Sequence, residues 1–94
     1  MSEALLAPFV EALTAHGMKP NRIAPDCEGG ACAYFLFEHC KGDEGYVIVH
    51  ADGEGVSALD YHPRRGINAE DIVDVEHCVQ VVAKYIGART KAMN

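Results

Sequence analysis

Apolar residues recur with a helical period near the start of the chain. Five of them lie three or four residues apart, as on one face of an α-helix: Leu5, Leu6, Phe9, Val10 and Leu13. Pro8 fits a helix only in its first turn, so we expect the regular helix to begin near Ala7. Gly17 is suited to end it, because glycine readily adopts the left-handed conformation of a helix C-cap.

The middle of the chain has the composition of β-strands. Three runs indicate strands, namely residues 31–38 (ACAYFLFE), 46–51 (YVIVHA) and 56–61 (VSALDY). The links at 41–45 and 52–55 are short and rich in glycine and acidic residues, as in β-hairpins, so we expect an antiparallel meander. The preceding segment 18–30 (MKPNRIAPDCEGG) predicts a loop, with a short extended piece at residues 22–24.

A second helix is indicated near the end of the chain. Asn68 is a good N-cap residue, and Glu70 and Asp71 would follow in the first turn, where the helix dipole favours acids. The pattern continues with a 3–4–3–4 spacing of apolar residues: Ile72, Val75, Val79, Val82 and Ile86. The valines leave an alternative open, a strand at residues 79–82.

These elements predict an α+β fold for a single domain, residues 1–94. The expected order is α-β-β-β-α, a three-stranded antiparallel meander sheet with two helices packed on one face. The expected strand at 31–38 is apolar on both faces. Phe35 and Phe37 would therefore face the helices, while Tyr34 and Leu36 would lie on the opposite side.

Composition and charge narrow the function classes. The chain has 8 basic and 14 acidic residues, a formal net charge of −6. This charge opposes binding to nucleic acid and to anionic membranes, and it permits a basic protein partner. There is no 18-residue apolar run and no basic N-terminal region typical of a signal peptide, so we expect no membrane span, a cytoplasmic location and free thiols.

The expected order of elements resembles that of the double-stranded-RNA-binding domain. In that family the RNA contacts come from a basic start of the second helix and from the loop between the first two strands. Here the corresponding residues 68–74 (NAEDIVD) carry three acids, and the loop is acidic as well. The resemblance therefore implies a topology and does not imply RNA binding.

A second resemblance involves the first 60 residues, which are similar to the N-terminal segment of phage- and plasmid-type primases. It is carried by Phe9, Leu13, Gly17, Pro20, Ile23 and Asp26, then by Gly45-Tyr46-Val47 and Asp52-Gly53. No matching position is catalytic in that family. The resemblance implies a mobile-element origin and an accessory or inhibitor protein, as anti-CRISPR proteins are, that acts by binding other proteins.

The cysteines suggest a metal site that the expected geometry opposes. Cys27, Cys32 and Cys40, with His39, His50 or His62, are the zinc ligand types. Eight residues of strand span about 26 Å, so Cys32 and Cys40 cannot share a metal ion or a disulfide. We expect no metal, no cofactor, and Cys32 as a small core residue. The alternative function is a small metal- or anion-binding domain, using these three cysteines or Arg64 and Arg65.

Several other residues allow both a functional and a purely structural interpretation. Cys78 follows His77, but neighbouring helical residues do not face each other, so we expect core packing and no catalytic residue. Arg64 and Arg65 could bind an anion before the second helix, or pair with nearby acids. His50 and His62 could lie together on neighbouring strands. Four acids could form a partner-binding surface, or only a solvated face: Glu70, Asp71, Asp74 and Glu76.

The sequence thus favours a small acidic binding protein over an enzyme. It also predicts a homodimer formed through the sheet. Two helices cover one sheet face only, which leaves Tyr34 and Leu36 uncovered. The edge of the strand at 31–38 is too apolar to be exposed, so either residues 22–24 or a second copy should cover it.

Overall fold

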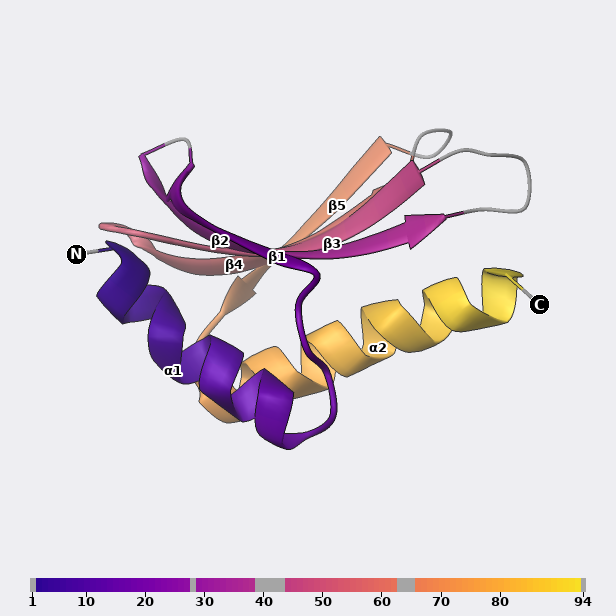
Figure 1. Cartoon of the computed structure of the whole chain (residues 1–94), viewed down its shortest axis with the longest axis horizontal. Helices are drawn as coiled ribbons and strands as arrows, with labels where there is room; N and C mark the ends of the chain where they lie inside the picture. The colour runs from indigo at the N-terminus through magenta and orange to yellow at the C-terminus, as the bar shows by residue number, and fades with distance from the viewer. Residues whose placement is uncertain (1, 28, 39–43, 63–65, 94) are drawn as a thin grey trace.

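The computed structural model describes residues 2–27, 29–38, 44–62 and 66–93. Its seven elements form an α+β fold (Figure 1). In chain order they are α1 (Ser2–Ala15), β1 (Arg22–Cys27), β2 (Gly30–Glu38), β3 (Glu44–Asp52), β4 (Gly55–His62), β5 (Gly66–Ile72) and α2 (Val75–Met93). The α+β class is confirmed, but the predicted three-stranded sheet is wrong, because the five strands form one antiparallel sheet in the order β1-β2-β3-β4-β5.

The central meander follows the sequence closely. β2, β3 and β4 lie where the three apolar runs predict strands, each extended by one or two residues at its ends. The turn between β3 and β4 is closed by Asp52, whose Oδ1 accepts the backbone N–H of Glu54 at 2.8 Å. Gly55 in this turn has a φ of 141°, a conformation that residues other than glycine rarely adopt.

An extra strand, β1, lies in the segment where the sequence predicts a loop. The extended piece expected at residues 22–24 continues to Cys27 and pairs with β2. The register shifts between Ala24 and Cys27, the interval that contains Pro25, and proline is tolerated here because β1 is an edge strand. The apolar edge of β2 is therefore covered by the protein's own chain.

A further strand, β5, replaces the predicted start of the second helix. Asn68 is not an N-cap: it lies in β5, opposite Asp60 of β4. Glu70 and Asp71 are likewise strand residues and not part of a first helical turn. Asn, Glu and Asp are poor strand formers, so local preference points to a helix start, and the pairing along β4 overrides it.

Helix α2 begins nearly two turns later than the sequence predicts, since its N-cap is Asp74 and not Asn68. The Oδ1 of Asp74 accepts the backbone N–H of His77 at 2.7 Å, which makes Asp74 the N-cap. In return, the Nδ1 of His77 accepts the N–H of Val73 at 3.2 Å, an exchange similar to a capping box. The alternative strand at residues 79–82 is wrong, since Val81 and Val82 are buried on this helix.

Helix α1 begins at Ser2, earlier than Pro8 predicts, and contains that proline in its interior. Proline costs a helix about 3 kcal/mol, and the packing of Leu6 and Leu13, both fully buried, offsets this cost. The predicted C-cap is confirmed. Gly17 has a φ of 82°, and the N–H of Met18 donates to the carbonyl of Leu13 at 2.8 Å, as in a Schellman motif.

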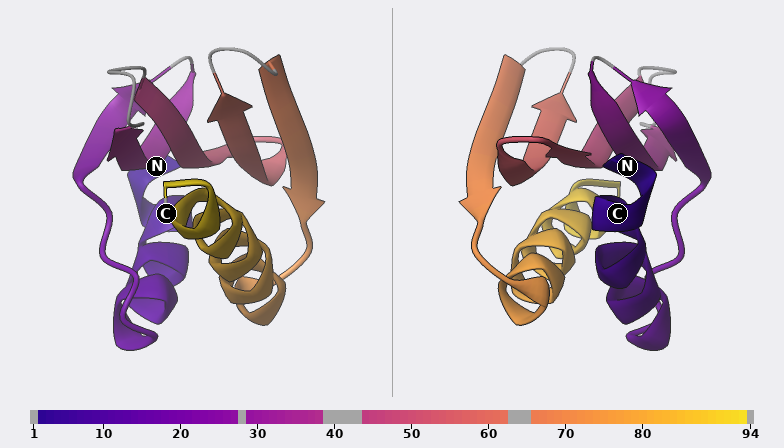
Figure 2. Two further views of the ribbon diagram at one scale, coloured as in Figure 1. Left: turned by 90° about the vertical axis from the view of Figure 1, so that its right-hand side faces the viewer. Right: turned by 90° about the vertical axis from the view of Figure 1, so that its left-hand side faces the viewer.

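Both helices lie on one face of the twisted sheet, here called the inner face (Figure 2). The core lies between them and this face. Cys78 is one of its members, as predicted, and burial raises the pKa of its thiol to about 11. The largest fully buried side chains are those of Leu6, Leu13, Val47, Val49, Val82 and Cys78.

The two candidate helix starts can be separated by mutation. We expect Asp74→Ala to lower the free energy of unfolding by about 1 kcal/mol, because the N–H of His77 loses its acceptor. Asn68→Ala is the matched control, and it should cost less because Asn68 caps nothing. Chemical denaturation measures both, and a larger loss for Asn68→Ala than for Asp74→Ala would contradict the observed helix start.

Candidate functional site: the outer face of the sheet

The side of the sheet opposite the helices, here called the outer face, carries three rows of side chains that run across the strands. The register of the strands defines each row. The aromatic row comprises Leu36, Tyr46, Tyr61 and Ile67. The middle row comprises Arg22, Tyr34, Ile48, Leu59 and Ala69. The polar row comprises Ala24, Cys32, His50, Ser57 and Asp71.

The aromatic and middle rows are apolar apart from Arg22, although they face away from the core. Leu36 is 45% exposed and Ile67 is 61% exposed, while Ile48 and Leu59 are half-buried among their neighbours. An antiparallel sheet that packs on one face usually alternates to polar residues on the other. In the described part of the chain both helices are on the inner side (Figure 2), so neither covers these two rows.

Two half-buried tyrosines form the centre of the aromatic row. Tyr46 and Tyr61 lie opposite each other on β3 and β4, and their rings stack with centroids 5.6 Å apart at an interplanar angle of 27°. Leu36 and Ile67 extend the row on either side. Stacking restricts both rings before anything binds, so a partner would meet a preformed surface and not two mobile side chains.

Tyr34 is held from two directions in the middle row. The guanidinium of Arg22 lies 4.7 Å from the centroid of its ring, a cation–π contact. Its hydroxyl is 3.1 Å from the Sγ of Cys27. This hydrogen bond and burial raise the pKa of Tyr34 to about 12, and the nearby Cys32 adds to the shift. The phenol therefore stays protonated at neutral pH, while Arg22 remains the positive charge at this margin of the face.

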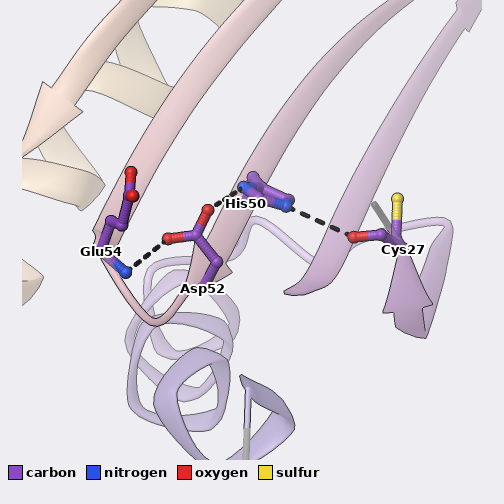
Figure 3. Close-up of polar contacts among 4 residues, drawn as sticks. All are labelled: Cys27, His50, Asp52 and Glu54. Atoms are coloured by element: carbon purple, nitrogen blue, oxygen red, sulfur yellow. Dashed lines mark hydrogen bonds and ion pairs between the residues drawn. The ribbon is translucent and has the colours of Figure 1, made fainter. Parts of the chain in front are cut away.

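The polar row continues into a hydrogen-bonded cluster beside the β3–β4 turn (Figure 3). The Nε2 of His50 is 3.4 Å from the carbonyl oxygen of Cys27, and its Nδ1 is 3.6 Å from the Oδ2 of Asp52. Asp52 in turn accepts the N–H of Glu54. These contacts tie the end of β1 to β3, and they make this end of the outer face polar.

The cysteines of the alternative metal site are only partly brought together. Cys27 and Cys32 both lie near the hydroxyl of Tyr34 and are not disulfide-bonded, while Cys40 and His39 lie outside the described residues. Within residues 2–27, 29–38, 44–62 and 66–93, no group of three or more His, Cys, Asp or Glu side chains could hold a metal ion. Cys32 is buried as predicted, but it lies in the polar row and not in the core cluster.

The predicted acidic surface is divided between the two faces of the sheet. Glu70 is on the inner side, where its Oε2 accepts a hydrogen bond from the hydroxyl of Tyr85 at 3.4 Å. Asp71 is on the outer face, and Asp74 caps α2 with Glu76 in its first turn. These acids therefore do not share one helix face. Their role in binding a partner stays a prediction.

Two further predictions concern the arginine pair before the second helix and a possible pair of histidines. Arg64 and Arg65, the predicted anion-binding pair, lie outside the described residues. His50 and His62 are not neighbours, because His50 lies opposite Ser57 whereas His62 pairs with Gly66 at the other end of β4.

Sequence reasoning missed most of the outer face. It identified Tyr34 and Leu36 by alternation, and it placed Tyr46 on the same strand face as His50 without joining it to them. It did not identify Tyr61 and Ile67. The signal for the two tyrosines was present, since alternation within β3 and β4 places both on the side of Leu36. For Ile67 there was none, because its strand was interpreted as a helix start.

Comparisons with protein-family models, curated proteins and solved structures find no match for this chain. The resemblances to RNA-binding domains and to primase segments therefore stay predictions. No helix in the described part of the chain is long and apolar enough to cross a membrane.

The raised pKa of Tyr34 predicts a loss of stability in alkali. Folding favours the protonated phenol, so its contribution to the free energy of unfolding is complete below pH 10 and is lost as the pH rises towards 12. Tyr34→Phe has no such proton, and we expect its stability to fall less steeply over this range. Denaturation curves at several pH values measure the difference, and parallel pH profiles for the two proteins would contradict the hydrogen bond to Cys27.

Proposed function

We propose that this chain is a non-catalytic binding domain that holds another protein chain on its outer face. The observation that carries the proposal is the composition of the aromatic and middle rows, which extend across the sheet with large apolar and aromatic side chains. Contiguous apolar surface of this kind, rimmed by polar residues, marks interaction sites in soluble proteins.

The chemistry of the face favours a protein over other ligands. Tyrosine and arginine are enriched in protein interfaces relative to the rest of the surface, and here Arg22 lies over Tyr34. Among the described residues of the outer face, Arg22 and His50 are the sole basic side chains, whereas Asp52 and Asp71 are acidic. Together with the net charge of −6, this balance disfavours nucleic acid and anionic lipid.

The wider role follows from the same proposal. A domain that acts by binding suits the accessory or inhibitor protein of phage or plasmid type that the primase resemblance implies. It would act in the cytoplasm, where Cys27 and Cys32 remain thiols. The homodimer that the sequence predicts is the first form of binding to consider, because it needs no second gene product. The acidic residues outside the outer face would then be free for a basic partner.

Charge introduced into the face should abolish binding. We expect Leu36→Glu and Ile67→Glu each to weaken binding to a protein partner about tenfold or more, because a carboxylate would be buried in the interface. Tagged wild-type and variant chains serve as bait, with host lysate and the untagged chain as separate prey, and retained protein is quantified.

Val73→Glu is the matched control. Val73 is 79% exposed and lies outside the sheet, between β5 and α2, so the same change in charge should leave binding unaffected. Circular dichroism checks that each variant is folded. Equal retention by wild type, Leu36→Glu and Ile67→Glu would overturn the proposed function.

A further inference from the structure

We infer that the outer face binds a second copy of this chain, in a face-to-face pair whose two-fold axis runs along β3. The inference rests on the proposed function and adds the identity and the orientation of the partner. In this arrangement β1 lies over β5 of the partner, β2 over its β4, and β3 over its β3. Two rim ion pairs, each between Arg22 and Asp71 of the other copy, fix the orientation.

The distribution of charge on the outer face selects this partner. Arg22 is exposed at the β1 margin and Asp71 is exposed at the β5 margin, with the apolar residues of β2, β3 and β4 between the two margins. A surface that is positive at one margin and negative at the other is complementary to its own copy after a rotation that exchanges the margins.

Only one of the two simple orientations makes use of this pattern. An axis along the strands places β1 over the partner's β5, so each Arg22 approaches an Asp71. An axis across the strands places β1 over β1 and β5 over β5, so that like charges share a margin. The β5 residue in the same row as Arg22 is Ala69, and Asp71 lies two residues beyond it. The offset along the strand between Arg22 and Asp71 of the other copy is therefore about 7 Å. The arginine side chain and the roughly 30° angle between packed sheets can accommodate this offset.

The size of the face is sufficient for a specific pair. Strands are spaced about 4.8 Å apart, so the five strands span about 19 Å, and the three rows span about 14 Å along the strands before the width of the side chains is added. Two such faces in contact would bury on the order of 1,000 Å² in total, near the lower end of specific protein interfaces. The stacked Tyr46–Tyr61 pair and Leu36 would provide the apolar contact beside the axis.

Charge reversal tests the pairing directly. We expect Arg22→Asp and Asp71→Arg each to weaken self-association about 10- to 100-fold, because each replaces two attractive contacts with two repulsive ones. An equimolar mixture of the two variants should recover dimers, since every rim contact between unlike copies is then Asp with Arg. The double variant R22D/D71R should also recover them. Sedimentation velocity across a concentration series measures the mass of each sample.

The outcomes separate the inference from the proposed function. Recovery in the mixture supports both the second copy and its orientation. A dimer that Leu36→Glu disrupts but whose charge variants do not recover on mixing would overturn the orientation and leave the face as a binding site. A wild-type monomer at high micromolar concentration would overturn the second copy, and face-dependent retention of a lysate protein would then still support the proposed function.

Discussion

The fold depends on how closely two helices can approach one face of the sheet. Four small residues lie on the inner face beside Val47 and Val49, and all are fully buried: Ala31, Ala33, Ala51 and Ala58. Because these side chains are short, Leu6, Leu13 and Val82 of the helices reach the sheet and complete the core between the two layers. Both helices pack on this one side (Figure 2). Neither helix therefore covers the apolar side chains of the outer face.

The outer face has the opposite design, with large side chains and partial exposure. Its tyrosines suit this position because each has an apolar ring and a hydroxyl that can remain hydrated, so an unpaired copy can stay in solution. Tyr34 shows how such a residue is held in place. Arg22 lies over its ring, and its hydroxyl forms a hydrogen bond with the Sγ of Cys27. The same contacts that order the surface also place a positive charge at its β1 margin, which links local packing to the choice of partner.

The sequence predicted the elements whose patterns are local and strong. β2, β3 and β4 follow from alternation and short turns, and the end of α1 follows from Gly17. The two edge strands were missed for physical reasons. Pro25 opposes a strand except at a bulged edge, and Asn68, Glu70 and Asp71 have the local signature of a helix start, which only pairing with β4 overrides. Since Arg22 and Asp71 lie on these edge strands, the charge pattern of the outer face could not be predicted either.

Charge and apolar contact act over different distances when two copies meet. Each chain carries a formal net charge of −6, so two copies repel at long range. That repulsion is screened over about 8 Å at physiological ionic strength, whereas burial of Leu36 and the tyrosines does not depend on charge. Rim ion pairs contribute little free energy in water but penalise the wrong orientation. In such a pair the apolar rows would set the affinity, and Arg22 and Asp71 would set which of the possible orientations forms.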